Sequence, residues 1–218
     1  MGASLRRFAK SLRVALVRYF FEAQCIVCEM KIEAFSPLCR WCFAFEKAPV
    51  ILTDSQHRST YVFCRKARKY WHQVKFQKEM FFLRSLKKHL LLDLTPFIAF
   101  EGYSVIPVPM HFSKYLERGF NQSEILARWW SQTFKIPLCA QGLVKVQDTV
   151  PQSTLSRKER ETNLKNVFEW DTKVPLPEKV LLIDDVYTTG STLAACKAVL
   201  KKVGVKEIYT WTLFQTPG

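Results

Sequence analysis

The sequence predicts an α/β domain with a mostly parallel central sheet flanked by helices, preceded by a small N-terminal four-cysteine module. Two apolar runs of strand type, 102–108 and 180–183, are each followed by a polar loop and then by a helical pattern. This alternation is typical of parallel sheets with crossover helices. At 218 residues and 48% hydrophobic content, the chain can form one such domain with a small appendage. We expect a helix over 1–24, the cysteine module over 25–50 and the α/β domain over 51–218.

The first 24 residues carry apolar and cationic side chains at helical spacing, which predicts a basic amphipathic helix. Such a helix could pack within the protein, lie on an acidic membrane surface or serve as a transit peptide, since transit peptides are also rich in arginine and poor in acids. No apolar run approaches the roughly 18 residues that span a bilayer, and the start lacks the pattern of a signal peptide.

Four of the seven cysteines form two C-x2-C pairs, Cys25 with Cys28 and Cys39 with Cys42. Two such pairs close a tetrahedral four-cysteine zinc site without an open position, which indicates a structural ion rather than a catalytic one. The odd total and the tight pairing favour metal binding in a reducing compartment over disulfides. We therefore expect bound Zn²⁺ and a cytoplasmic protein.

The net charge of +14 is concentrated between residues 58 and 88, where ten cations accompany a single acid, Glu79. Polyanions are the natural partners of such a stretch, because each neutralised phosphate releases counterions. Interleaved rings could stack on the bases of a single strand; the alternative is a solvated basic face whose rings belong to the core. The candidate nucleic-acid contacts are Arg65, Lys66, Arg68, Lys69 and Lys75, and the interleaved rings are Tyr61, Phe63, Tyr70, Trp71 and Phe76.

The loop between strand 102–108 and the expected helix 123–134 is rich in cationic and amide donors. It contains His111, Lys114 and Arg118, which suit a diphosphate, and Gly119, which relaxes the backbone. The alternative is an ordinary solvated crossover. Further on, the basic polar segment 152–168 is typical of a mobile flap that excludes water from a reaction.

The run 179–192 combines a strand, two adjacent acids and a hydroxyl-rich turn. Asp184 and Asp185 follow the apolar residues 180–183, at the strand end where ligands bind in open α/β sheets. The turn leads into a helical pattern over 193–203, stopped by Gly204, and the N-terminus of a helix favours a phosphate. Two acceptor-only carboxylates suit the hydroxyls of a ribose or a metal-bound water.

This order of acid pair and phosphate turn indicates a ribose 5-phosphate site. One alternative is a structural turn in which the acids and hydroxyls only cap the helix. Another is a Walker B strand, but the chain lacks the phosphate-binding loop that accompanies one.

The same run resembles the phosphoribosyl-pyrophosphate (PRPP) motif of type I phosphoribosyltransferases. The resemblance implies that Asp184 and Asp185 meet the ribose hydroxyls as the catalytic acids, that the turn holds the 5-phosphate, and that Mg²⁺ accompanies PRPP. The implied PRPP-binding residues are Asp184, Asp185, Val186, Tyr187, Thr188, Thr189, Gly190, Ser191 and Thr192, with His111, Lys114 and Arg118 from the earlier loop.

Four features together resemble the ComF family of competence proteins: the cysteine pairs, the Arg-Gly-Phe-Asn-Gln block at 118–122, the segment 152–163 and the PRPP-type motif. The resemblance implies a role in natural transformation, contact with incoming single-stranded DNA, and a helicase-like translocase as partner. The chain departs from the family pattern at 78–79, where Lys-Glu replaces Gly-Asp, and at Lys145, near where an arginine is usual. The helix before Cys25 is also outside the pattern.

The expectation is therefore a type I phosphoribosyltransferase-like α/β protein of the ComF kind, binding PRPP with Mg²⁺ and acting on incoming single-stranded DNA. If it is catalytic, a nucleophile would displace pyrophosphate at the anomeric carbon, with Mg²⁺ and cationic loops stabilising the departing diphosphate. The alternative is a non-catalytic zinc- and DNA-binding adaptor for a DNA-uptake translocase, with a vestigial or sensory nucleotide pocket. The acceptor, the oligomeric state and a peripheral contact of 1–24 with an acidic membrane stay open.

Overall fold

The computed structural model describes residues 24–25, 27–32, 39, 42, 56–76, 86–87, 90, 100–147 and 167–217. The helix expected over 1–24, the turn at 78–79 and nearly all of the flap expected over 152–168 lie outside these described residues. Within them, no helix has both the length and the apolar character needed to cross a bilayer.

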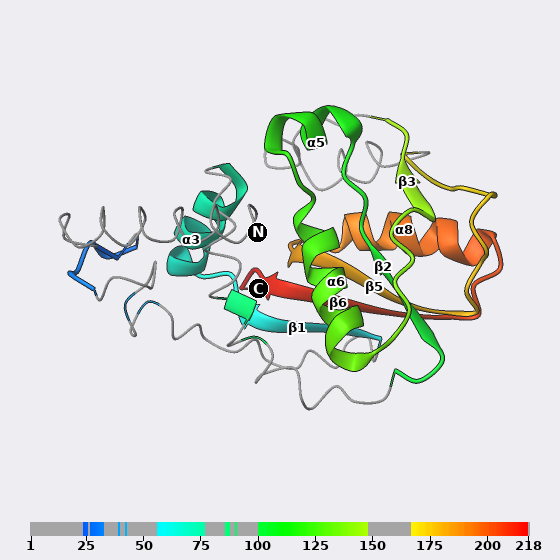
Figure 1. Ribbon diagram of the computed structural model, residues 1–218, viewed down its shortest axis with the longest axis horizontal. Coiled ribbons are helices and arrows are strands. Elements are labelled where there is room, and N and C mark those ends of the chain that lie inside the picture. The colour runs from blue at the N-terminus through cyan, green and yellow to red at the C-terminus, as the bar shows by residue number, and fades with distance from the viewer. Residues whose placement is uncertain are drawn as a thin grey trace, which may run out of the picture.

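A four-stranded parallel sheet forms the centre of the structure (Figure 1). Its order is β1 (His57–Val62), β6 (Glu207–Gln215), β5 (Lys179–Tyr187) and β2 (Tyr103–Pro107), and all three pairings are parallel. The strands expected at 102–108 and 180–183 are both present, as β2 and within β5. Residues 180–183 are fully buried because both faces of the sheet are covered.

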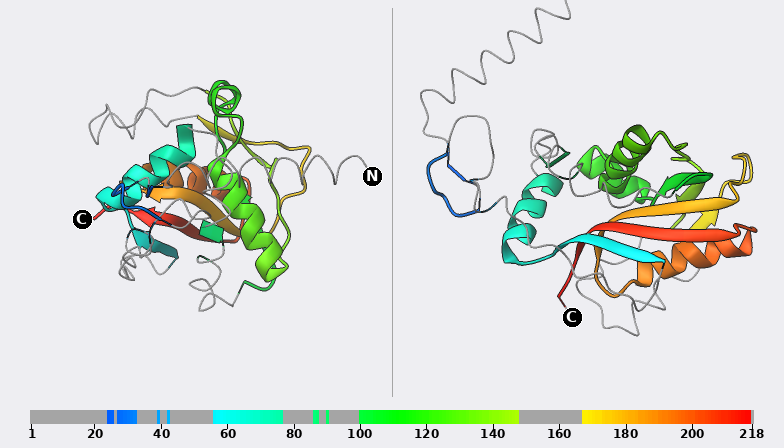
Figure 2. Two further views of the ribbon diagram at one scale, coloured as in Figure 1. Left: turned by 60° about the vertical axis from the view of Figure 1, so that its left-hand side comes forward. Right: turned by 90° about the horizontal axis from the view of Figure 1, so that it is seen from below.

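Two helices cover opposite faces of this sheet (Figure 2). The first, α6 (Gln122–Phe134), packs through Leu126 and Trp130 into a cluster with Leu181 and Trp211. The second, α8 (Ser191–Lys202), packs Leu193, Cys196 and Leu200 against the face that carries Val180, Leu182 and Ile208. Both expected helices are thus confirmed, and the crossovers place the carboxyl ends of β2 and β5 side by side.

Two further helices stand beside these carboxyl ends (Figure 1). The basic helix α3 (Arg65–Phe76) follows β1 and packs Ala67, Tyr70 and Val74 into the cluster beneath α6. The short helix α5 (Phe112–Arg118) lies in the segment that the sequence suggested was a loop. It has no buried residue, so its sequence lacks the apolar periodicity that predicts a helix. His111 caps its start, and Gly119, at φ 80°, ends it.

A separate two-stranded antiparallel sheet, β3 (Leu143–Lys145) with β4 (Phe168–Trp170), packs against α8. Phe168, which the sequence assigned to the end of a flap, is instead 3% exposed and part of the core on that face.

Candidate functional site

Asp184 lies at the carboxyl end of β5 and is almost buried, at 9% exposure. Its Oδ1 accepts a hydrogen bond from the hydroxyl of Ser123 at 2.8 Å and another from the backbone N–H of Asp185 at 2.8 Å. Ser123 is held in turn by the start of α6, where the side chain of Asn121 accepts from its backbone N–H. The first acid is therefore fixed by the crossover that follows β2.

Asp185 is held by a different part of the chain. Its Oδ2 accepts from the indole N–H of Trp71 at 2.6 Å and forms an ion pair with the ammonium of Lys75 at 2.7 Å. Trp71 and Lys75 are one helical turn apart on α3, so they reach the same oxygen. These contacts fall on Oδ1 of Asp184 and on Oδ2 of Asp185, and a backbone hydrogen bond from Val186 also stabilises the Asp185 carboxylate.

The two acids differ in proton affinity. Burial, and then the neighbouring Asp185, raises the pKa of Asp184 to about 7. Burial acts in the same direction on Asp185, but the ion pair with Lys75 and the hydrogen bond from Trp71 hold the pKa of Asp185 below its ordinary value. Near neutral pH the pair therefore carries between one and two negative charges.

The turn after β5 has the geometry of an anion site at a helix start. Gly190, with φ 76°, is the N-cap of α8, and no side chain caps the helix there. A Cβ on Gly190 would lie 2.6 Å from the hydroxyl of Tyr187, so glycine is required for both its conformation and its size. The hydroxyls of Thr189 and Ser191 are 2.8 Å apart at the same turn. Backbone and hydroxyl donors thus converge where α8 begins.

A cavity of about 190 Å³ joins the acids to the cationic loop. It is bordered by α3, the loop after β2, β3 and the start of α8. Six of the expected PRPP-binding residues line it, namely Asp184, Asp185, Thr192, His111, Lys114 and Arg118.

The remaining turn residues lie partly elsewhere. Tyr187, Thr189, Gly190 and Ser191 border a larger cavity, of about 850 Å³, between α8 and β4, while Val186 and Thr188 line neither. The lining of the larger cavity comes mostly from alanine, valine and aromatic side chains, and it has no acid pair. The smaller cavity is therefore the candidate site, although it is not the more spacious one.

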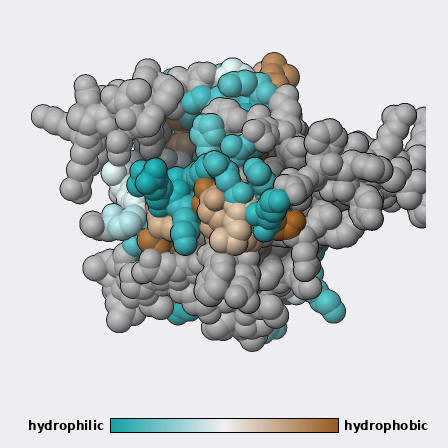
Figure 3. Space-filling view, turned by 90° about the vertical axis from the view of Figure 1, so that its left-hand side faces the viewer, coloured by the Kyte–Doolittle hydropathy of each residue, from teal (hydrophilic) through white to brown (hydrophobic). Residues whose placement is uncertain are grey.

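Lys75 differs from its expected role. The sequence grouped it with the nucleic-acid contacts, whereas the structure places it in the cavity, paired with Asp185. The other four, Arg65, Lys66, Arg68 and Lys69, are exposed on α3. Figure 3, which views the molecule from the α3 side, shows hydrophilic side chains gathered on this face.

The rings between these cations mostly belong to the core. Tyr61, Tyr70 and Trp71 are at most 4% exposed, so the stacking interpretation is wrong for them and the core alternative holds. Phe63 is half-buried and packs against Phe214.

Gln122 belongs to the donor-rich loop of the sequence interpretation but was not among the predicted PRPP-binding residues. Its side chain is 2% exposed, lines the candidate cavity, and its amide nitrogen has no hydrogen-bond partner among the described residues. A buried donor without an acceptor is costly, so native structures rarely retain one without a ligand or water. Such a donor cannot be recognised before the fold shows where it is buried. Ser123 and Lys145 also line the cavity and were not predicted as site residues, since only the fold brings Ser123 to Asp184.

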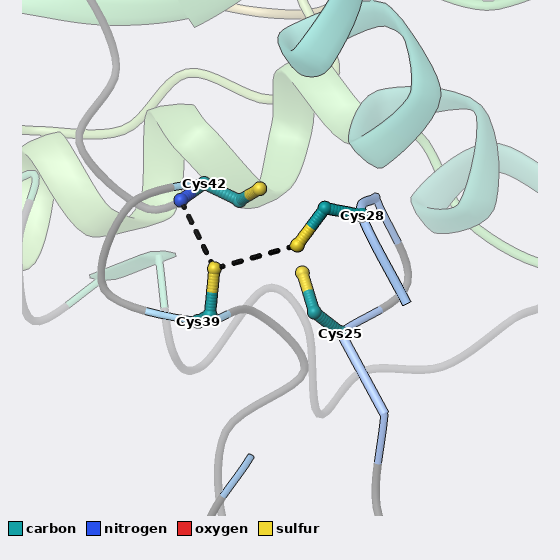
Figure 4. A group of neighbouring side chains, drawn as sticks. All are labelled: Cys25, Cys28, Cys39 and Cys42. Carbon is teal, nitrogen blue, oxygen red and sulfur yellow. Dashed lines mark hydrogen bonds between the residues drawn. The ribbon is translucent and has the colours of Figure 1, made fainter. Parts of the chain in front are cut away.

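The four paired cysteines come together as expected (Figure 4). Their sulfur atoms all lie within 4.8 Å of one another, and Cys28 and Cys39 are 3.6 Å apart. A tetrahedral zinc–thiolate site has Zn–S bonds of about 2.3 Å and hence S···S distances of about 3.8 Å. Burial acts to raise the pKa of Cys25, but hydrogen bonds from surrounding backbone groups lower it to about 6, whereas burial and the neighbouring thiols raise the pKa of Cys42. The residues present therefore fit a structural zinc ion.

The chain matches a protein-family model, several named proteins and solved structures. Residues 121–218 match the family model described as "Phosphoribosyl transferase domain". The chain is 40% identical over 112 residues to Competence protein F of Haemophilus influenzae, covering 50% of this chain and 49% of that protein. It is 30% identical over 149 residues to DNA utilization protein YhgH of Escherichia coli K12, covering 66% and 65%.

A longer match is to Competence protein ComFC of Streptococcus pneumoniae, 27% identical over 192 residues, or 88% of this chain and 80% of that one. The chain thus spans about half of the Haemophilus relative and about two thirds of the Escherichia one. Among solved structures, a hypoxanthine phosphoribosyltransferase from Staphylococcus aureus aligns with a TM-score of 0.40 and 16% identity, over 61% of this chain and 62% of that one.

Proposed function

The chain belongs to the ComF family and carries a phosphoribosyltransferase-type domain, and from this premise we propose that it binds PRPP with Mg²⁺ in the 190 Å³ cavity and acts in DNA uptake. The observation that carries the proposal is the shared cavity itself. A buried acid pair, the first turn of a glycine-capped helix and several cations border one space.

Each group suits one part of a phosphoribosyl diphosphate. The carboxylates of Asp184 and Asp185 can accept hydrogen bonds from the two ribose hydroxyls, which are donors. The first turn of α8 receives the 5-phosphate. On α5, Lys114 and Arg118 supply positive charge for the diphosphate, and Gln122, at the start of α6, adds a neutral donor.

In a transfer reaction the chain's own residues would orient the ribose and stabilise the departing diphosphate. Asp184 and Asp185 fix the sugar ring, and the cations on the loop after β2 receive the charge that develops on the leaving oxygen. Bound Mg²⁺ would neutralise part of the diphosphate charge and orient it. The nucleophile comes from the acceptor.

Calorimetry with PRPP and Mg²⁺ tests the site. The Asp184→Asn/Asp185→Asn double variant should bind PRPP at least tenfold more weakly than the wild type, because two charged acceptors for hydroxyls are lost. Asp171→Asn, a carboxylate in the turn after β4 and away from the cavity lining, serves as the matched control and should bind normally. Equal binding by the wild type and the double variant would refute the assignment.

A second candidate function is that of a non-catalytic adaptor, in which the same pocket senses PRPP while the chain binds single-stranded DNA. The observation that favours it is the exposed basic face of α3, formed by Arg65, Lys66, Arg68 and Lys69. Pyrophosphate release, measured with free bases and with single-stranded DNA as acceptors, separates the two functions. Release with one acceptor supports an enzyme, and PRPP binding without release supports the adaptor, with a helicase-like translocase as its expected partner.

A further inference from the structure

The two acids of the candidate site depend on different parts of the chain. Asp184 is bonded by Ser123, on a helix that covers the centre of the sheet. Asp185 is bonded by Trp71 and Lys75, on a helix at the side of the sheet. Any displacement of α3 would therefore disturb one acid and leave the other in place.

The position of α3 is itself tied to the cysteine cluster. The ammonium of Lys69 donates to the carbonyl oxygen of Val27 at 2.9 Å and lies 3.6 Å from the carboxylate of Glu29. Val27 lies between the paired Cys25 and Cys28, and Glu29 follows directly. Buried side chains of the cluster and of α3 also share one hydrophobic core, which includes Cys25, Cys39, Cys42, Ala67, Tyr70, Trp71 and Val74.

The arrangement of these parts in space matches the contacts. In Figure 1, α3 stands between the segment that carries the cysteines and the carboxyl ends of the strands. One face of the helix thus contacts the cysteine module, while Trp71 and Lys75 reach the sheet.

We propose that Trp71 and Lys75 are positioning residues for Asp185, and that metal binding at the four cysteines holds α3 in place, so that loss of the metal weakens ribose-phosphate binding. This inference rests on the proposed function. The indole N–H and the ammonium both bind Oδ2 and so fix the orientation of the Asp185 carboxylate beside the cavity. The two contacts measure 2.6 and 2.7 Å, so a shift of α3 by about 1 Å would carry both beyond ordinary hydrogen-bond length and release the carboxylate.

Ribose 5-phosphate and inorganic diphosphate, titrated separately, distinguish positioning from direct contact. Trp71→Phe keeps a ring of similar shape but removes the donor. It should weaken ribose 5-phosphate binding about tenfold and leave diphosphate binding within about twofold. In the Asp185→Asn background the same change should add little, because its effect acts through that carboxylate. An additive loss, or an equal loss for diphosphate, would overturn the positioning role.

The link to the metal is tested on the zinc-loaded full chain. Lys69→Met removes the contacts with Val27 and Glu29 and should weaken ribose 5-phosphate binding several-fold. Lys66→Met, the same charge change on an exposed position of the same helix, is the matched control and should bind normally. Identical affinities in the two variants would overturn the link.

Removal of zinc by a chelator gives an independent measurement. The affinity for ribose 5-phosphate should fall several-fold in the wild type and return when zinc is added back, with circular dichroism verifying that the fold persists. If the zinc-free protein unfolds, the comparison of Lys69→Met with Lys66→Met still tests whether the cysteine module affects ribose 5-phosphate binding. If the zinc-loaded wild type binds neither ribose 5-phosphate nor PRPP, the proposed function fails; if it binds but is indifferent to zinc and to α3, only this inference fails.

Discussion

Asp184 and Asp185 are neighbours in sequence, yet their surroundings give them different chemistry. The first is nearly buried and accepts two hydrogen bonds from neutral donors, whereas the second is paired with an ammonium group. Near neutral pH, the partly protonated carboxyl of Asp184 can donate a hydrogen bond, while the ionised carboxylate of Asp185 accepts one. The difference in pKa arises from contacts with α3 and α6, so it cannot be predicted from the sequence of β5 alone.

The raised pKa of Asp184 predicts a pH-dependent stability. Its folded pKa of about 7 lies above its ordinary value of 3.8, so its contribution favours the folded state below about pH 4 and is lost as the pH rises through 7. Asp184→Asn can still accept the bonds from Ser123 and the Asp185 N–H but does not titrate. The unfolding free energy of the wild type minus that of Asp184→Asn should therefore fall by on the order of a few kcal/mol between pH 4 and pH 8.

Urea unfolding of both proteins across this range, without PRPP or Mg²⁺, makes the measurement. The charged partner Lys75, the neighbouring Asp185 and the cysteines are common to both proteins, so their direct contributions largely cancel. A difference that stays constant with pH would contradict the raised pKa.

Gln122 predicts a separation of stability from binding. Gln122→Met keeps the length of the side chain and removes a buried donor that has no partner among the described residues. The unfolding free energy should stay within ~0.5 kcal/mol of the wild type or increase, while the affinity for PRPP falls several-fold.

Asn121→Leu is the matched control for this change. Asn121 is also a buried amide, but its nitrogen donates to the carbonyl of Val108 at 3.0 Å and its oxygen accepts from the Ser123 N–H. Its loss should cost about 1–3 kcal/mol of unfolding free energy. Thermal denaturation and calorimetry compare the two, and an equal destabilisation would contradict the assignment of Gln122 to the ligand.

At the scale of elements, two of the four parallel strands, β2 and β5, and the helices α6 and α8 could be predicted from sequence because their apolar patterns are strong, whereas β1 and β6 were not predicted. Residues 180–183 and the pattern of α6 illustrate this. Helix α5 could not be predicted, since it buries nothing and its cap signals lie in a loop-like composition. The ion pair of Lys75 could not be predicted for a different reason, because its partner Asp185 lies 110 positions away and only the fold brings them together.

The turn between β5 and α8 predicts a graded cost for adding a methyl group. Gly102→Ala, at φ 78° with open space around the new Cβ, should lose about 1 kcal/mol of unfolding free energy from conformation alone. Gly190→Ala, at φ 76°, should lose more, because its Cβ would also meet the ring and hydroxyl of Tyr187.

Urea unfolding of both glycine variants separates the two contributions. PRPP affinity should fall in Gly190→Ala and stay normal in Gly102→Ala, since only the former reshapes the start of α8. Equal destabilisation and equal binding would show that the turn tolerates the change.

On the scale of the whole molecule, the +14 charge is spread over surfaces with different surroundings. Lys75, Lys114 and Arg118 border the candidate cavity, whereas Arg65 and Lys66 are exposed on α3. Phe112 and Leu116, at 68% and 64% exposure, add an apolar surface on α5, the helix that also carries Lys114 and Arg118. A long polyanion could therefore contact α3 without displacing a ligand from the cavity.

The expected binding of single-stranded DNA can be localised by its salt dependence. Arg65→Ala/Lys66→Ala should reduce the slope of log K against log salt concentration by about 1.4, that is, about 0.7 for each lost phosphate contact. Lys201→Ala/Lys202→Ala removes the same charge from exposed positions at the end of α8. Fluorescence anisotropy over a range of salt should show a smaller slope for the first pair only, and the reverse order would move the DNA face to α8.

The order of the strands has a consequence for how the chain is made. Among the described strands, β1 pairs with β6, β2 pairs with β5 and the remaining pairing joins β5 to β6, while Val105 of β2 also bridges to Leu138. Both central strands lie after residue 178, so a growing chain leaves the ribosome with β1 and β2 still lacking neighbours. The nascent protein must therefore keep these two strand segments from aggregating until residues 179–215 emerge. A premature stop anywhere before β5 would thus release a chain without its sheet, rather than a shortened protein.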